Sequence, residues 1–352
     1  MPTVPLKHSV QDLESFLHRF YFNVLYRSFK LESKDFVEAV KKSLRDKCAR
    51  SHNLSLEHIS KVRHKEADRC SYTYKFSVLH SAVVIHHFLE LLKWDESLIE
   101  RVVSSKRLEI CCVGGRSIPE AVGIYKIISD ILENHKKERS SPLALKITVV
   151  SLFKGWSTNA WKVLKLLKKD SELHNPKKVK LTTCVVQGDL TKFDSKHVIS
   201  AIQKADFISI MKFISELILP TKTRSANDTI VRSMIKEIFR NMKDEAYLFF
   251  LDDSEDGYYD MAEEGARWYS NCKLKQARLH EVYTLNIDSL RHETEYLYHT
   301  FENLCKTHTI VSSGTWKKVK LTGNALSCAK RPLSKIPTSS TSKIEDILKK
   351  QD

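Results

Sequence analysis

The sequence predicts an α/β fold in which a doubly wound, mostly parallel sheet follows an α-helical N-terminal region. From Leu108 onwards, short apolar runs alternate with stretches of helical periodicity, as is typical of parallel strands joined by crossover helices. Near the C-terminal end of this alternation, strand-like runs at 307–312 and 315–321 flank Ser313-Gly314 and predict a terminal antiparallel hairpin. Before Leu108, residues 9–104 read as helical because their apolar side chains recur at helical spacing.

The chain of 352 residues is long enough for one large domain or two ordinary ones. We expect a helical N-terminal region at 1–104, a sheet domain at 105–328 and a basic tail at 329–352. The tail is rich in Pro, Ser, Thr and Lys and cannot build an apolar core, so we predict that it is disordered.

Individual elements follow from the same periodicities. Parallel strands are expected at 108–113, 145–152, 181–187, 206–213 and 246–251. Helices are expected at 35–48, 55–68 and 74–94 ahead of the sheet, at 117–133, 157–169, 195–204 and 227–242 between its strands, and near 287–305. The stretch between the last parallel strand and that final helix reads as a polar loop.

Lysine and arginine number 58 against 43 aspartate and glutamate residues, for a formal net charge of +15. This surplus favours an anionic partner, most simply RNA or DNA, although solubility alone also explains it. One basic cluster consists of Lys136, Lys137 and Arg139, and a second consists of Lys165, Lys168, Lys169, Lys177, Lys178 and Lys180. Such basic loops fit phosphate contacts, and solvated loops explain them equally well.

The cysteines and the apolar stretches restrict the class of protein further. Eight cysteines occur without a C-x-x-C pair, so we expect free thiols in a reducing compartment and no zinc or other metal. The first residues lack a signal-peptide pattern, and no uninterrupted apolar stretch is long enough to span a bilayer. We therefore expect no membrane association and a cytoplasmic or nuclear location.

A glycine pair at the end of the first strand is the most informative local feature. Gly114 and Gly115 follow an apolar run and precede a helical stretch, so the chain reads as strand, tight turn and helix. Glycine at such a turn lets the backbone approach a ligand, with the helix amides directed at it. An ordinary strand-to-helix turn is the alternative, because neither the three spaced glycines of the dinucleotide fingerprint nor a G-x-x-x-x-G-K-[ST] loop is present.

The order of strands and helices with a terminal hairpin resembles the class I S-adenosylmethionine-dependent methyltransferase fold, a Rossmann-like sheet, over roughly 108–321. The resemblance implies S-adenosyl-L-methionine as cofactor, with its methionine part passing the Gly114-Gly115 turn. It implies that Asp189, in the Gly188-Asp189-Leu190 loop after the third strand, bonds the adenine amino group while Leu190 helps to hold the ring. A turn aspartate that bonds its own backbone is the alternative.

The end of the fourth strand is where the family faces the reacting atoms. Lys212 and Glu216 are therefore the candidate catalytic residues, with Glu216 as a base. A carboxylate favoured by the helix dipole is the alternative for Glu216. Asp252 and Asp253, after the fifth strand, read as an acidic turn rather than as a metal site.

Two positions depart from the family pattern. Arg116 stands where a third glycine is common, and it either crowds the cofactor or pairs with its carboxylate. The second strand ends at Ser151 without the usual acidic residue that grips the ribose, and a serine cannot give a charge-assisted bond. In the helix that follows, Trp156 and Trp161 are expected to face different directions. Either one lines the adenine pocket, as predicted for Trp156, or both pack in the core.

Gly155-Trp156, after the second strand, resembles a Gly-Trp stretch in poorly characterised eukaryotic methyltransferase-like proteins, some of whose distant relatives act on ribosomal RNA. The resemblance thus implies a methyltransferase, with RNA bound through basic loops as the acceptor. The departures at Arg116 and Ser151 sustain a second hypothesis. On that hypothesis the fold has lost catalysis and serves as a scaffold, with a protein partner bound by the N-terminal helices.

Overall fold

The computed structural model describes residues 10–49, 65–114, 118–135, 139–151, 154–170, 175–217, 224–253, 257–269, 271–284, 300–301 and 308–320. Met1–Val319 forms one compact unit, and Lys320–Asp352 forms another that lies almost entirely outside the described residues. The predicted tail at 329–352 therefore cannot be compared with the structure, and the boundaries at 104 and 328 stay predictions. Within the described residues, no helix has the length and apolar character needed to cross a bilayer.

The structure is built on a seven-stranded sheet with the order β3-β2-β1-β4-β5-β7-β6. Its strands are β1 (Arg107–Val113), β2 (Leu143–Ser151), β3 (Val179–Gln187), β4 (Phe207–Met211), β5 (Tyr247–Asp253), β6 (Cys272–Thr284) and β7 (His308–Lys318). The first five pair in parallel, and β7 runs antiparallel to both β5 and β6. A doubly wound sheet in which one reversed strand, β7, lies between β5 and the edge strand β6 confirms the predicted fold class.

The terminal antiparallel pair consists of other strands than those predicted. The expected hairpin across Ser313-Gly314 is wrong, because β7 passes through both residues without a turn. Within the strand, a Cβ at position 314 would come within 2.7 Å of the Tyr259 ring. Close packing, rather than a turn, therefore explains the glycine. The partner strand β6 and the helix α11 (Tyr258–Arg267) both occupy the stretch that read as a polar loop. The helix expected near 287–305 falls largely outside the described residues.

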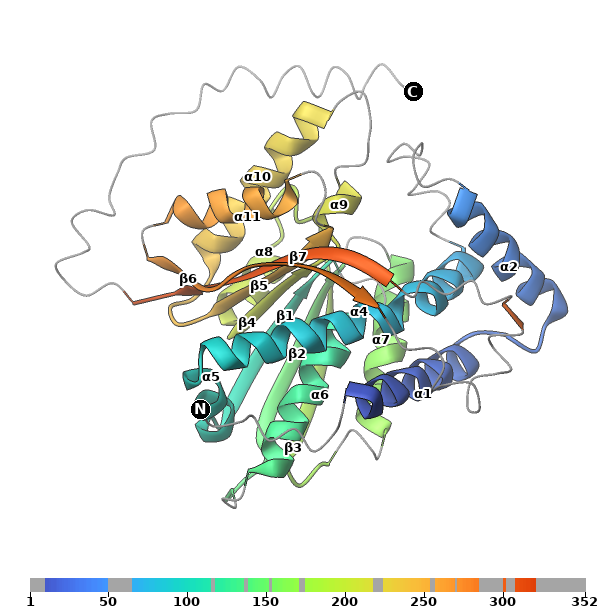
Figure 1. The fold of residues 1–352 in the computed structure, drawn as a ribbon, viewed down its shortest axis with the longest axis horizontal. Helices are drawn as coiled ribbons and strands as arrows, with labels where there is room; N and C mark the ends of the chain where they lie inside the picture. The colour runs from blue at the N-terminus through green and yellow to red at the C-terminus, as the bar shows by residue number, and fades with distance from the viewer. Residues whose placement is uncertain are drawn as a thin grey trace. The chain divides into compact units, whose positions relative to one another are not determined.

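Helices cover both faces of the sheet (Figure 1). One layer contains α1 (Val10–Ser28), α4 (Glu66–Trp94), α5 (Ser97–Ser104), α6 (Pro119–Asn134) and α7 (Lys154–Lys169), and α2 (Lys34–Ala49) packs on α4. The other contains α8 (Lys196–Lys204), α10 (Arg224–Asn241) and α11, with the short α9 (Ile214–Leu217) beside them. The helices expected at 35–48, 117–133, 157–169, 195–204 and 227–242 are confirmed with small shifts of their ends. The helix expected at 74–94 begins earlier, at Glu66, so α4 also contains 66–68, which was predicted as the end of a separate helix at 55–68. Most of 55–68 is not described.

The central strand β1 is apolar and buried from Ile110 to Val113 because the layers cover both of its faces. Ile110 and Cys112 belong to the core beneath α4 and α6, whereas Cys111 and Val113 belong to the core beneath α8 and α10. The N-terminal helix α4 enters the first of these cores directly, since a Cβ on Gly123 of α6 would lie 2.9 Å from Val84. The helical N-terminal region therefore shares its core with the sheet.

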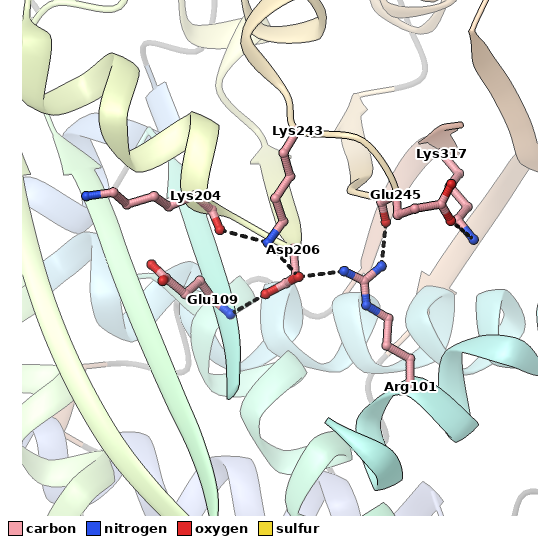
Figure 2. Close-up of polar contacts among 7 residues, drawn as sticks. All are labelled: Arg101, Glu109, Lys204, Asp206, Lys243, Glu245 and Lys317. Carbon is pink, nitrogen blue, oxygen red and sulfur yellow. Dashed lines mark hydrogen bonds and ion pairs between the residues drawn. The ribbon is translucent and has the colours of Figure 1, made fainter. Parts of the chain in front are cut away.

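A charged network joins several elements at the edge where the parallel strands begin (Figure 2). Asp206, 7% exposed just before β4, accepts hydrogen bonds from Arg101 of α5 at 2.5 Å and from the backbone N–H of Glu109 in β1 at 2.8 Å. Lys243 lies 2.7 Å from the same carboxylate, and Arg101 also donates to the backbone oxygen of Glu245. One carboxylate thus ties α5, β1, β4 and the segment before β5 together.

Replacing Asp206 by alanine is expected to lower the free energy of unfolding by about 3 kcal/mol, because two cations lose a shared, mostly buried carboxylate. Urea unfolding followed by circular dichroism measures the change. The control is Asp244→Ala, an exposed carboxylate in the neighbouring turn, which should change stability by no more than about 0.5 kcal/mol. Equal losses for the two variants would show that Asp206 does not hold these elements together.

Candidate cofactor site

Three loop tips converge at the carboxyl edge of β1, β2 and β3. The strands are in register, with Val113 opposite Val150 and Ser151 opposite Gln187. The backbone N–H of Gly114 donates to the oxygen of Val150 at 3.1 Å, and that of Gly188 donates to the oxygen of Ser151 at 3.2 Å. The structure therefore confirms that the segments singled out in the sequence meet at one rim of the sheet.

The turn after β1 requires glycine at its first position. Gly114 has a φ of +102°, and a Cβ there would lie 2.8 Å from Cδ2 of Phe213, in the segment after β4. The positive φ and the close approach both exclude a larger side chain. Gly115 and Arg116 lie outside the described residues, so their predicted contacts with the cofactor stay predictions.

Ser151 ends β2 between the tips of β1 and β3. Its side chain is 3% exposed, and no carboxylate stands at this position. A hydroxyl can donate or accept one hydrogen bond to a ribose, whereas a carboxylate accepts from two hydroxyls with charge assistance. The contact with the ribose stays a prediction.

Asp189 uses one carboxylate oxygen in its own turn. Oδ1 accepts from the N–H of Thr191 at 2.9 Å and from the Thr191 hydroxyl at 2.6 Å. Oδ2 has no hydrogen-bond partner in the part of the chain that the structure describes. Leu190 is 4% exposed and packs in the same apolar cluster as Val113 and Val150. The turn therefore fixes the carboxylate and leaves one oxygen for an amino group, so the turn and cofactor interpretations are compatible.

The charged groups at the ends of β4 and β5 bind one another. Lys212, 7% exposed and with a φ of 48°, donates to Asp253 and to the Thr309 hydroxyl. Asp252 is fully buried, and its carboxylate accepts the N–H groups of Ile214 and Asp253, both at 2.8 Å. Burial, together with the charge of Asp253, raises the pKa of Asp252 to about 6. The hydrogen bonds and the ion pair of these side chains therefore stabilise the conformation of the segment after β4.

The catalytic roles proposed for Lys212 and Glu216 stay predictions. The ammonium of Lys212 is already held by a carboxylate, and the side chain of Glu216 in α9 lies outside the described residues. No group of His, Cys, Asp and Glu side chains among the described residues is arranged to hold a metal ion. Asp252 and Asp253 are thus explained by their hydrogen bonds and ion pair.

The two tryptophans of α7 point in different directions. Trp156 is 3% exposed and meets Tyr72 of α4 edge to face, with ring centroids 5.2 Å apart. Trp161 is 51% exposed, so the alternative that placed both rings in the core is wrong. Trp156 follows the carboxyl end of β2 within the first turn of α7, and its contact with adenine stays a prediction.

The first turn of α6 contains a buried carboxyl group that the sequence pattern does not reveal. Glu120 is 3% exposed, and burial raises its pKa to about 7 although its own backbone N–H is hydrogen-bonded to it. Nearby, Ser81 of α4 donates to the oxygen of Pro119 at 3.1 Å and pairs with the Tyr21 hydroxyl at 2.9 Å. An acidic residue at a helix start normally reads as solvated and dipole-stabilised, so only burial distinguishes this one.

Arg139, predicted in a basic cluster, is committed to the backbone. Its guanidinium donates to the oxygens of Ser105 at 2.5 Å and Val102 at 3.4 Å, at the C-terminal end of α5. Its neighbours Lys136 and Lys137 are not described. Arg139 therefore stabilises a helix terminus, a role that neither the phosphate nor the solvated-loop interpretation included.

The order of the strands and the single reversed strand decide the architecture. The chain has the class I methyltransferase fold. No protein-family model matches the sequence, and no curated protein matches it. Among solved structures, it is similar to precorrin-6y C5,15-methyltransferase from Geobacter metallireducens, with 12% identity and a TM-score of 0.34 over 63% of this chain and 85% of the other. A SAM-dependent methyltransferase from Methanosarcina mazei gives 11% and 0.32 over 63% and 98%.

A third similar structure is NSun6 from Pyrococcus horikoshii, with 14% identity and a TM-score of 0.34 over 64% of this chain and 51% of the other. Identities and TM-scores this low carry no argument about fold, family or activity. The assignment to the class I methyltransferase fold therefore rests on the strand order and the strand directions.

Replacing Gly114 by alanine is expected to lower the free energy of unfolding by about 2 kcal/mol, because it combines a positive φ with a clash against Phe213. Urea unfolding measures the loss. The matched control is Gly257→Ala, where φ is also positive at +71° but the nearest atom would be 3.5 Å away, so its loss should be smaller. A larger loss at Gly257 would contradict the packing argument.

Replacing Glu120 by glutamine should stabilise the protein more at high pH than at low pH. Because the folded-state pKa is raised to about 7, the native protein holds this proton while the unfolded chain releases it. The wild type therefore loses stability as pH rises from about 4.5 to 7, and the variant lacks this loss. Thermal unfolding at pH 5 and at pH 8 measures it, and an unchanged difference in Tm would exclude a buried, titrating Glu120.

Proposed function

We propose that this protein is an S-adenosyl-L-methionine-dependent methyltransferase whose acceptor is RNA. The observation that carries the proposal is the meeting of Gly114, Ser151 and Asp189 at the carboxyl edge of a sheet of this order. In open α/β sheets, ligands bind outside the carboxyl ends of the strands, where the strand order reverses. Here that reversal lies between β1 and β4, where Gly114 and Phe213 touch.

The residues present fit the cofactor at two of its three parts. The Gly114 turn brings backbone close to the place of the methionine part. The Asp189 oxygen that has no partner among the described residues suits the adenine amino group, and the neighbouring Leu190 is apolar. The ribose would meet the hydroxyl of Ser151 in place of a carboxylate. We therefore expect this protein to bind the cofactor less tightly than relatives that have an acidic residue there.

The bound cofactor would supply the methyl group. The protein's part is to align the acceptor with that group and to exclude water. Phe213 and the segment fixed by Lys212, Asp252 and Asp253 are suited to this task, because their hydrogen bonds and burial hold the rim beside the Gly114 turn. Glu216 is the candidate for removing a proton from the acceptor.

The RNA acceptor is supported by the net charge of +15 and by the basic residues that remain exposed. An excess of positive charge attracts a polyanion before any specific contact forms. The same excess fits a nucleic-acid-rich location, in the cytoplasm or nucleus, and the free thiols of the described cysteines fit a reducing one.

A second function, an inactive scaffold, is favoured by one observation. The described ionisable side chains at the ends of β4 and β5 already have partners within the protein. Lys212 donates to Asp253, and Asp252 accepts the backbone N–H groups of Ile214 and Asp253. On this hypothesis the N-terminal helices would bind a protein partner. The partner's recovery in an affinity pulldown should then survive Asp189→Ala, and loss of the partner on that change would count against a scaffold.

Isothermal titration calorimetry with S-adenosyl-L-methionine tests the methyltransferase proposal. We expect saturable heat for the wild type and an affinity about tenfold or more lower for Asp189→Asn, which retains an acceptor for Thr191 but loses the charge. The matched control is Asp194→Ala, an exposed carboxylate in the same loop that should leave the affinity unchanged. Absence of heat and of a thermal shift with the wild type would overturn the proposal.

A further inference from the structure

We propose that the outer face of α7 binds single-stranded nucleic acid and leads it to the carboxyl edge of the sheet. The proposal deepens the proposed function, on which it rests for the chemistry at that edge. It identifies a surface of α7 that stacks a base on Trp161 and contacts phosphates through lysines.

The exposed side chains of α7 form one stripe along the helix. Lys154, Thr158, Trp161, Lys165 and Lys168 are all exposed and recur at intervals of three and four residues, so they share one face. The helix contains several lysines and no acidic residue. Its sixteen residues span about 24 Å, which is enough to contact several consecutive phosphates.

The lysines of this face keep their charge available. No ion pair among the described residues involves Lys154, Lys165, Lys168 or Lys169. Lys162, on the flank of the helix, is different, because it donates to the backbone oxygen of Ser28 at 2.7 Å and lies near Glu66. Lys162 therefore anchors α7 to α1, whereas the lysines of the stripe can bind an anion.

Trp161 provides a surface on which a base can stack. Its ring is 51% exposed, and the ammonium of Lys165 lies 5.2 Å from the ring centroid. Aromatic side chains interleaved with cations are typical of surfaces that bind single strands, because every base has a face that stacks and every step has a phosphate. In a duplex the bases are already stacked on each other, so this arrangement favours a single strand.

The stripe adjoins a cavity of about 230 Å³ between α7 and α1. The charged residues that line it are Arg19, Arg27, Lys169 and Asp170, so its cations outnumber its carboxylates. Lys169 adjoins the stripe on the helix surface, and Arg27 adds a further cation. The other end of the stripe, at Lys154, follows the carboxyl end of β2 closely. A strand bound along α7 would therefore have one end at the candidate cofactor site.

A membrane surface is the other partner that a basic helix with a tryptophan can suit. Binding a bilayer requires the apolar face of such a helix to enter the lipid. The apolar face of α7 is unavailable, because Val163, Leu164 and Leu167 are fully buried in the core of the protein. The charge and the exposed ring therefore favour nucleic acid over lipid.

Fluorescence anisotropy with a labelled single-stranded oligoribonucleotide, without cofactor, tests the proposal on the full chain. We expect Trp161→Ala to raise Kd about tenfold, and Trp161→Phe to retain most of the affinity. We expect Lys165→Gln/Lys168→Gln to reduce the slope of log Kd against log salt by about 1.4, since each phosphate contact contributes about 0.7 for a single strand. These exposed positions should leave the Tm unchanged.

The matched control is Trp268→Ala. Trp268 is 60% exposed at the end of α11, with the Lys236 ammonium 4.0 Å from its ring centroid, and it lies with the helices of the other layer. Its replacement should leave the Kd for RNA unchanged. Equal effects of Trp161→Ala and Trp268→Ala, or no effect of either, would overturn the proposal.

Two further probes distinguish the polyanions. Single-stranded DNA of the same sequence that binds with the same dependence on Trp161 would support the proposal, as would a preference for RNA over DNA. Anionic phosphatidylserine vesicles that bind with the same dependence on Trp161 and Lys165 would overturn it. Because the measurement contains no S-adenosyl-L-methionine, failure of cofactor binding and failure of this surface are separate results.

Discussion

The burial of β1 on both faces is the constraint on which the rest of the structure depends. Its alternate side chains enter two different cores, so the chain cannot turn until the strand has left both layers. It then turns at Gly114, where a positive φ and the closeness of Phe213 require glycine. Because β2 and β4 are in register with β1, this one turn determines where Ser151, Gly188 and the segment after β4 meet.

The two edges of the sheet use their charged groups differently. At the edge where the parallel strands begin, Asp206 binds two cations and accepts a hydrogen bond from a backbone N–H. These interactions join elements that are far apart in the chain. At the carboxyl edge, Lys212, Asp252 and Asp253 hold the rim, and Asp189 retains a carboxylate oxygen beyond its own turn. The residues that distinguish an enzyme from a scaffold are therefore few, and Asp189 is the one that a point substitution tests most directly.

Prediction from the sequence succeeded where local pattern and tertiary environment agree. The apolar runs of β1, β4 and β5 are buried on both sides, so their composition alone identifies them. The prediction failed at Ser313-Gly314, which resembles a turn but lies inside β7. There the Tyr259 ring occupies the space that a Cβ on Gly314 would need. The prediction also failed for β6 and α11, whose polar residues resemble a loop. Trp161 was assigned to the core or a pocket because a large apolar ring is usually buried.

By itself, the sequence determined the fold class, the order of the parallel strands along the chain and the loop that carries Asp189, because burial periodicity and glycine turns are local properties. Only the tertiary structure decided which charges remain available. The sequence places Arg139 in a basic cluster and Lys212 near the reacting atoms, yet backbone oxygens hold Arg139 and a carboxylate holds Lys212. Lys162, on the same helix as Lys165, is likewise held by a backbone oxygen. Lys165 and Trp161 remain at the surface. Such differences depend on partners distant in the chain, which no local pattern encodes.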